Sequence, residues 1–177
     1  MERLRLHIPD LSELWYRQKL LSDPDTMYFN RTSDSSGCID FVEDAFSDWY
    51  KYWIKGFPMR YYAYIVRISD GSFIGEVWLY KNDIVDFYED YYKMGIIIEN
   101  KFRRVGYGRE ALELLLDVAF CELGAASVNN FFESYRSEAL KVHLNSGFKV
   151  DSVKNHICNV SITAREYFNN RKSNCST

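Results

Sequence analysis

The chain has 177 residues, of which 47% are apolar and 17% aromatic, and its formal charge at pH 7 is −3. A chain of this length buries enough apolar surface to fold without disulfides or metals. Its mildly acidic balance argues against nucleic acid as the main partner, because nucleic-acid binding favours a basic face.

Metal and membrane partners are not expected either. The four cysteines show no CxxC spacing and do not cluster with the three histidines, so neither a zinc site nor a disulfide framework is predicted. The N-terminal segment has no apolar signal core, and no apolar run approaches the roughly 18 residues of a membrane span. We therefore expect a soluble cytoplasmic protein without a bound metal.

The N-terminal third predicts one strand and two helices. Apolar and polar residues alternate in "RLRLHI" (3–8), as in a strand. "PDLSELWYRQKLLSD" (9–23) predicts a short helix, and "NRTSDSSG" (30–37) predicts a loop. Apolar residues then recur at helical spacing over 39–54, before Gly56, and predict the second helix.

The middle of the chain predicts three strands in succession. "RYYAYIVRI" (60–68) and "FIGEVWLY" (73–80) flank "SDGS", which is a turn signal, so they form a predicted hairpin. "YYKMGIIIEN" (91–100) adds a strand whose continuous apolar run is typical of a buried central position.

The remaining chain alternates helices and strands. It predicts a helix over 108–123, a strand over 127–133, a helix over 137–146, and strands over 148–153 and 156–168.

These elements, about seven strands and about four helices, indicate one α+β domain. The sequence contains neither repeats nor a linker, so we expect a single domain over residues 1–168 and a frayed tail over 169–177. The aromatics of the second predicted helix either form a dimer face or belong to the core, which leaves a homodimer open.

The segment "ENKFRRVGYGREALELLLDVAF" (99–120) carries the clearest functional signal. Gly106 and Gly108 lie where a strand passes into an apolar helix, and glycine lets a backbone approach a ligand closely and adopt positive φ. A helix N-terminus offers N–H groups and a partial positive charge, which attract phosphate. Three arginines add formal charge at the same point: Arg103, Arg104 and Arg109. The loop therefore predicts an anion cradle suited to a pyrophosphate; the alternative is a tightly packed helix start with solvated arginines.

Two kinds of phosphate-binding fold use such a loop. "GYGREA" satisfies the dinucleotide pattern G-x-G-x-x-A. In that fold, however, the strand leads almost directly into the first glycine, whereas "ENKFRRV" intervenes here. The residues after Gly108 also show no second βαβ half. The architecture thus argues against NAD.

The chain resembles the GCN5-related N-acetyltransferase (GNAT) superfamily from about Leu4 to the last strand. "RRVGYG" (103–108) matches the R-x-x-G-x-G loop of that family. "FIGEVWLY" is similar to its third strand, and "EALKVHLNSGF" (138–148) is similar to the helix that ends in Gly-Phe. The layout around "SDPDTMYFN" is similar to the branch of ribosomal-protein N-terminal acetyltransferases.

The resemblance implies the GNAT fold, a mixed and mostly antiparallel sheet that is splayed between strands four and five and holds acetyl-CoA there. It implies that the backbone of Ile96, Ile97 and Ile98 pairs with the pantetheine arm and the thioester carbonyl, where main-chain donors stabilise the oxyanion. It also implies that the pyrophosphate is held by the loop residues Arg103, Arg104, Val105, Gly106, Tyr107, Gly108 and Arg109.

The resemblance further implies direct attack of an amine on acetyl-CoA in a ternary complex. The general acid of the family is often a tyrosine in the helix before Gly-Phe, where this chain has His143, which can donate a proton near neutral pH. His143 is thus either that acid or a structural histidine, and Tyr135 is a second candidate. Arg136 stands where many relatives bond the pantetheine arm with asparagine, so it either binds the coenzyme or lies on the surface.

The base and the acceptor site are predicted from acidic residues. Many relatives have a glutamate in strand four just before the central run, where this chain has "YYKMG". Glu76 is a candidate base if it faces the cleft. Glu89 and Asp90 lie beside aromatic rings and suit a cationic amine, or they belong to a solvated hairpin loop.

The sequence thus predicts an acetyl-CoA-dependent N-acetyltransferase that acts on a small-molecule or peptide amine. A peptide terminus, a polyamine, an aminoglycoside and an amino-acid-like metabolite all remain open as acceptors. The alternative is a GNAT-shaped CoA-binding protein with little catalysis, which acts as a sensor or interaction module.

Overall fold

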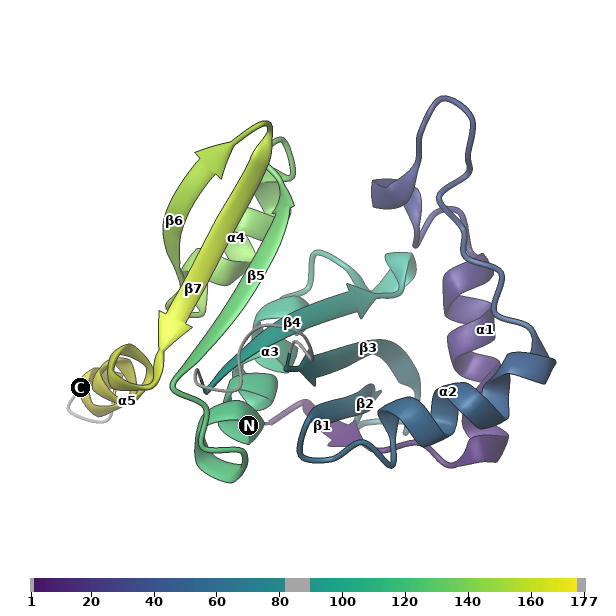
Figure 1. The fold of residues 1–177 in the computed structure, drawn as a ribbon, viewed down its shortest axis with the longest axis horizontal. Helices are drawn as coiled ribbons and strands as arrows, with labels where there is room; N and C mark the ends of the chain where they lie inside the picture. The colour runs from purple at the N-terminus through teal and green to yellow at the C-terminus, as the bar shows by residue number, and fades with distance from the viewer. Residues whose placement is uncertain (1, 82–89, 175–177) are drawn as a thin grey trace. The chain divides into compact units, whose positions relative to one another are not determined.

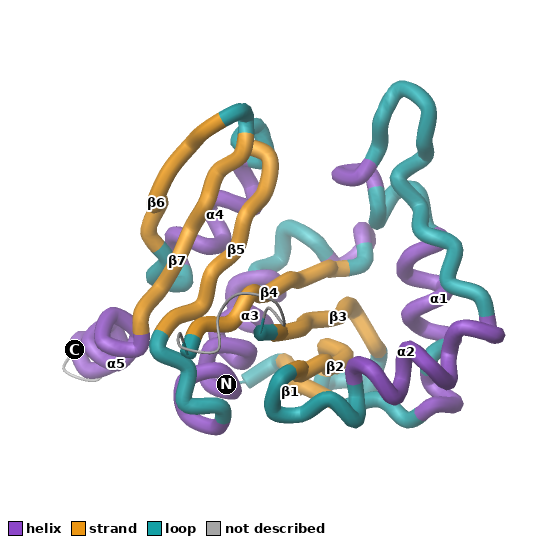
Figure 2. Tube along the Cα trace, in the orientation of Figure 1, coloured by secondary structure: helices purple, strands orange, loops and turns teal. Residues whose placement is uncertain are grey.

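The computed structural model describes residues 2–81 and 90–174 (Figure 1). Seven strands form a mixed sheet in the order β1-β2-β3-β4-β5-β7-β6. Along the chain the order of strands and α-helices is β-α-α-β-β-β-α-β-α-β-β-α, and Figure 2 distinguishes the two by colour. The fold is α+β, as predicted. The strands are β1 (Leu4–His7), β2 (Arg60–Arg67), β3 (Phe73–Tyr80), β4 (Tyr91–Ile98), β5 (Ser127–Glu133), β6 (Lys149–Lys154) and β7 (Ile157–Thr163). The α-helices are α1 (Trp15–Ser22), α2 (Phe46–Trp53), α3 (Tyr107–Asp117), α4 (Ser137–Asn145) and α5 (Ala164–Asn174).

The chain divides into two compact units. Unit one comprises residues 1–78 and 96–111, and unit two comprises residues 79–95 and 112–177. The single domain over 1–168 and the frayed tail stay predictions.

In unit one, α1 and α2 cover the same face of the strands. Tyr62 and Tyr64 lie two residues apart on β2, so their side chains share one face of the sheet. The ring of Tyr16 from α1 meets Tyr64 edge-on with ring centres 5.0 Å apart, and Trp49 from α2 meets Tyr62 at 4.6 Å. An aromatic core therefore joins both helices to β2.

In unit two, β7 lies between β5 and β6 and pairs antiparallel with both. His143 of α4 packs against Phe132 of β5 with ring centres 5.0 Å apart. Tyr167 of α5 packs on Phe120 at 4.8 Å, and its hydroxyl donates to the carboxylate of Asp117. These contacts fix α4 and α5 within the unit.

The predicted helix over 39–54 is wrong in its first half. The α-helix covers only Phe46–Trp53, after a 3-10 turn at Glu43–Ala45. The preceding chain is tied to α1, because the N–H of Ile39 donates to the carbonyl of Leu21 at 3.0 Å. The apolar spacing upstream of residue 46 therefore reflects an irregular segment, not a helix face.

Two further boundaries differ from the prediction. The helix over 108–123 is divided into α3 and a π-helical turn at Val118–Glu122. The strand predicted over 156–168 ends at Thr163, where α5 begins. A capping box explains that start: the N–H of Glu166 donates to Oγ1 of Thr163 at 3.3 Å, and the N–H of Thr163 donates to Oε2 of Glu166 at 3.0 Å.

None of the helices in the described ranges combines the length and apolarity that a membrane span needs.

Candidate functional site

The predicted glycine loop (103–109) opens α3 in a conformation suited to an anion. The φ angles of Arg104 and Gly106 are +66° and +89°. Left-handed residues within a turn aim neighbouring N–H groups to one side and so create anion-binding concavities. α3 begins at Tyr107, and the N–H of Glu110 donates to the carbonyl of Gly106 at 3.3 Å. The N–H groups of the first turn point out of the helix end, where the helix dipole is positive.

Arg3, which the sequence did not single out, braces this loop. Its backbone N–H and Nε donate to the carboxylate of Glu110 at 2.7 and 2.8 Å, and Nη1 donates to the carbonyl of Val105 at 3.1 Å. The guanidinium carbon lies 4.9 Å from the centre of the Tyr107 ring. Although partial burial acts to raise the pKa of the Glu110 carboxyl, the hydrogen bonds and charge of Arg3 lower it. A cation from the N-terminus is therefore held at the loop.

The side chain of Arg103 has a structural role. Nε donates to the carbonyl of Ile98 at 2.9 Å, and Nη2 donates to the carbonyl of Thr26 at 2.6 Å. Oγ1 of Thr26 in turn accepts the N–H of Asn100 at 2.9 Å. The end of β4 is thus fastened to the segment after α1, and the predicted coenzyme contact of Arg103 depends on its main chain.

The predicted coenzyme strand is the second half of β4. Ile97 belongs to the core of unit one, while Ile96 and Ile98 are half-buried. β3 approaches this half closely, since a Cβ on Gly75 would lie 2.2 Å from the carbonyl oxygen of Ile97. These side chains are core residues, which is compatible with a backbone role in coenzyme binding.

Glu76, the candidate base, is completely buried on β3. Its carboxylate accepts hydrogen bonds from the Arg17 guanidinium and the Tyr62 hydroxyl. The Arg17 guanidinium lies 4.8 Å from the centre of the Trp49 ring and 5.3 Å from that of Phe41. Burial, followed by the charge of Glu76, raises the pKa of Tyr62, so the hydroxyl stays a donor. In this arrangement Glu76 is the counter-ion of Arg17.

His143 is buried on α4 with both ring nitrogens engaged. Nδ1 lies 2.8 Å from the carbonyl oxygen of Ala139, which can only accept, so Nδ1 carries the proton. Nε2 then accepts from Nδ2 of Asn130 at 2.9 Å, and Oδ1 of Asn130 accepts the N–H of Phe131 at 2.8 Å. Burial lowers the pKa of His143, which keeps the ring neutral. This geometry favours a role in orienting Asn130, and proton donation by His143 stays a prediction.

Tyr135 and Arg136 lie in the turn between β5 and α4. The Tyr135 side chain is 72% exposed. Nη1 of Arg136 lies 3.4 Å from the carboxylate of Glu133. Tyr135 is thus accessible to a substrate, whereas Arg136 is held near the end of β5.

The two predicted acceptor-binding carboxylates cannot be treated alike. Asp90 is exposed at the start of β4 and accepts a hydrogen bond from Nζ of Lys81 at 3.0 Å. Glu89 lies outside the described residues.

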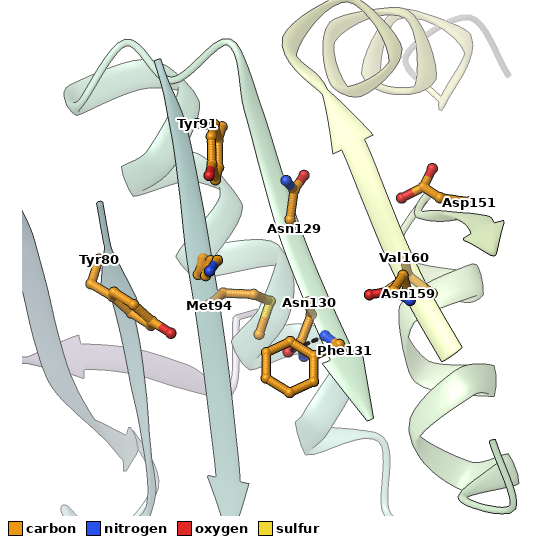
Figure 3. A pocket seen from close by; sticks show the side chains of 10 residues that line it. Tyr80, Tyr91, Met94, Asn129, Asn130, Phe131, Asp151, Asn159 and Val160 are labelled. Carbon is orange, nitrogen blue, oxygen red and sulfur yellow. Dashed lines mark hydrogen bonds between the residues drawn. The ribbon is translucent and has the colours of Figure 1, made fainter. Parts of the chain in front are cut away.

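A pocket of about 300 Å³ lies in unit two, where β4 and β5 stop pairing. The parallel ladder runs from Tyr91 and Ser127 to Lys93 and Asn129. Figure 3 shows Tyr80 and Met94 on one side of β5 and Asn159 and Asp151 on the other. The pocket is lined by Tyr80, Tyr91, Lys93, Met94, Asn129, Asn130, Phe131, Asp151, Asn159 and Val160. No motif in the sequence predicted this pocket; three asparagines within predicted strands were the available signal.

The family is decided by comparison with known proteins. A profile of the acetyltransferase (GNAT) domain matches residues 3–149. The chain belongs to the GNAT acetyltransferase family. Comparison with curated protein sequences gave no match.

Solved structures support the GNAT fold. A spermidine N-acetyltransferase from Vibrio cholerae, in complex with CoA and spermine, is 16% identical, with a TM-score of 0.76 over 95% of this chain and 99% of that one. A GNAT acetyltransferase from Bacillus anthracis is 16% identical, with a TM-score of 0.72 over 93% and 97%. A nucleotide-linked sugar GNAT in the apo state is 17% identical, with a TM-score of 0.76 over 98% and 94%. The predicted GNAT fold is confirmed, and the ribosomal-protein branch stays a prediction.

Acetyl-CoA is the co-substrate of GNAT enzymes, and the glycine loop of this chain fits its pyrophosphate. A residue with a side chain at position 106 would be strained at a φ of +89°, and its Cβ would lie 3.3 Å from Nη2 of Arg3, the residue that braces the loop. Within the described ranges, no group of three His, Cys, Asp or Glu side chains is arranged to hold a metal.

Proposed function

We propose that this protein is an N-acetyltransferase that moves an acetyl group from acetyl-CoA to a primary amine. The glycine loop carries the proposal: it opens α3 with positive φ at Arg104 and Gly106 in a chain of the GNAT family. The polyamine acetyltransferases among the similar structures support a small amine as acceptor.

The proposed reaction is direct attack in a ternary complex. The neutral amine nitrogen bonds to the acetyl carbon and the carbon–sulfur bond breaks. The proton that the nitrogen loses is finally transferred to the coenzyme thiolate. A lysine-like amine has a pKa of about 10.4 in water, so it must lose a proton before attack. The thiol of coenzyme A has a pKa near about 8.5 by analogy with cysteine, so a general acid assists without being essential.

We assign the proton donor to Tyr135 in preference to His143. The Tyr135 hydroxyl is exposed, whereas both ring nitrogens of His143 are engaged by Ala139 and Asn130. A general acid needs reach before it needs a suitable pKa. In this proposal His143 positions the Asn130 amide.

A CoA-binding protein with little catalysis is the second candidate. The engagement of Glu76 by Arg17 and Tyr62 favours it, because that carboxylate is not accessible as a base. Release of coenzyme thiol in the presence of a panel of amines separates the two functions, since a pure binder releases none.

Thermal melting with acetyl-CoA, CoA and NAD tests the coenzyme site. A ligand at a hundredfold its dissociation constant stabilises the native state by about 2.7 kcal/mol. For a domain of this size, that corresponds to a rise in Tm of about 5–10 °C. We expect this rise with acetyl-CoA and CoA but not with NAD. Gly106→Glu should abolish it, because a carboxylate then stands at the anion cradle.

Gly71→Glu is the matched control. Gly71 also has a positive φ, of +71°, and a Cβ there meets nothing within 4 Å. The Gly71→Glu variant therefore introduces the same charge and similar backbone strain in the turn between β2 and β3. Stabilisation by NAD alone, or an equal loss of coenzyme binding in both variants, would contradict the assignment of the loop.

A further inference from the structure

We propose that the pocket of unit two is the acceptor site and that it selects a small amine that also carries one anionic group, a carboxylate or a phosphate. This inference rests on the proposed acetyl transfer and names the acceptor class for it.

The position of the pocket follows from the ladder between β4 and β5. Pairing ends at Lys93 and Asn129, and the next residues of these strands, Met94 and Asn130, line the pocket. β4 then continues into Ile96–Ile98, the backbone proposed to hold the thioester arm. The pocket lining and the backbone proposed to hold the thioester arm thus both include residues of β4.

Lys93 gives the pocket its selectivity. Its side chain is half-buried, and within residues 2–81 and 90–174 it has no hydrogen-bond or ion-pair partner. Among the described residues of the lining, the other charged side chain is the carboxylate of Asp151. A partly desolvated cation gains from an entering counter-ion, so Lys93 attracts an anionic group and repels a second ammonium.

The rest of the lining is neutral or lies at the rim. Asp151 is exposed and accepts the Ser161 hydroxyl at 2.8 Å. Asn129, Asn130 and Asn159 contribute neutral amides. One lysine and one aspartate leave the described part of the lining without net charge, which matches an acceptor with one amine and one anionic group. A polyamine would bring several positive charges to a lining whose described residues include one exposed carboxylate.

The size of the pocket sets the size of the acceptor. A volume of about 300 Å³ lies at the lower end of the range for ligand pockets. It suits an amino acid or a phosphorylated amino sugar.

The test compares matched acceptors by steady-state thiol release at saturating acetyl-CoA. The pairs are L-phenylalanine with phenethylamine, L-lysine with cadaverine, and glucosamine 6-phosphate with glucosamine; spermidine is added as a polycation. We expect the anionic member of at least one pair to have a KM at least tenfold lower than its partner. The carboxylate and phosphate pairs distinguish the two sources of the anion.

Variants of Lys93 supply the second arm. Lys93→Ala and Lys93→Gln should raise the KM of the anionic acceptor by about tenfold to a hundredfold, the range for one charged hydrogen bond, and leave the KM of acetyl-CoA unchanged. Lys93→Glu should shift the preference toward cadaverine and spermidine. Lys154→Ala, at an exposed position on β6, is the control and should keep all wild-type values.

Calorimetric titration of the same acceptors into the CoA-bound protein needs no turnover. If they bind in a Lys93-dependent manner without thiol release, acetyl transfer fails and the pocket assignment stands. A wild-type preference for cadaverine or spermidine, failure of every anionic amine to bind, or unchanged KM and Kd in Lys93→Ala would overturn the assignment.

Discussion

Replacing Glu76 with alanine removes the counter-ion of Arg17 from the interior of unit one. The carboxylate is 0% exposed and is the acceptor for both Arg17 and Tyr62. Nε of Arg17 is already buried without a hydrogen-bond partner among the described residues. The variant would therefore leave a positive charge and a hydroxyl donor in a core of aromatic rings.

The expected cost follows from this burial. Removing one partner of a buried ion pair costs about 3–5 kcal/mol. Because the Arg17 side chain keeps 17% exposure and can recover some solvation, we expect the lower half of that range. At about 2–4 °C per kcal/mol, 3–4 kcal/mol lowers Tm by about 6–16 °C. The double variant Glu76→Leu/Arg17→Met removes both charges and should recover most of the loss.

Urea unfolding of the wild type, Glu76→Ala and the double variant measures these differences in the free energy of unfolding. Thiol-release assays on the folded fraction measure kcat for the same proteins. If Glu76 is a structural counter-ion, the Glu76→Ala variant should lose much of its stability while kcat falls less than about tenfold. If Glu76→Ala instead loses less than about 1 kcal/mol while kcat falls more than a hundredfold, Glu76 is the base and the reasoning is wrong.

Two further changes test the coenzyme strand and the buried histidine. Gly75→Ala would put a methyl group 2.2 Å from the Ile97 carbonyl oxygen, so β3 and β4 must separate. We expect the free energy of unfolding in urea to fall by more than about 2 kcal/mol and calorimetry to show weaker CoA binding. Wild-type values for both would show that the strands adapt freely. The pKa of His143 is lowered by burial, so it is neutral in both states at high pH, and only the unfolded chain takes up a proton as pH falls below about 6.5. The free energy of unfolding should then fall, by at most about 1.4 kcal/mol per pH unit, relative to His143→Gln between pH 7 and 5, and a difference that does not change with pH would contradict this.

The sheet and the glycine loop could be predicted because their signals are local. The strands predicted at 60–68 and 73–80 flank a clear turn signal, and the structure places β2 and β3 there. The loop combines glycines with a strand-to-helix change, and glycine permits the left-handed φ found at Gly106. Such features depend on neighbours in sequence.

The start of α2 was missed although a local signal existed. Apolar spacing extended the helix back to residue 39, but the acidic pair Glu43 and Asp44 marks the true N-terminus, where negative charge meets the helix dipole. The start of α5 had a similar signal in Thr163 and Glu166, the two ends of a capping box. In both cases the prediction followed the spacing of apolar residues and did not take the capping residues into account.

The candidate site was less predictable because its contacts join distant parts of the chain. Nothing near Glu76 in the sequence indicates Arg17 as its partner, and nothing near His143 indicates Asn130. Burial of a charged or polar side chain is tolerated only with such partners. Whether a glutamate or histidine is catalytic or structural is therefore decided by residues that the local pattern does not include.

For the arginines of the glycine loop, contacts with residues distant in sequence change the expected chemistry. Sequence spacing assigns them to the coenzyme phosphates, but the Arg103 side chain is bound to main-chain carbonyls, and Arg3, from the far end of the unit's sequence, is the cation that braces the loop. Both side chains fix backbone conformation. Pyrophosphate affinity should consequently depend first on the main-chain N–H groups at the start of α3, since these are held in place before the ligand arrives and no side chain must be ordered to present them.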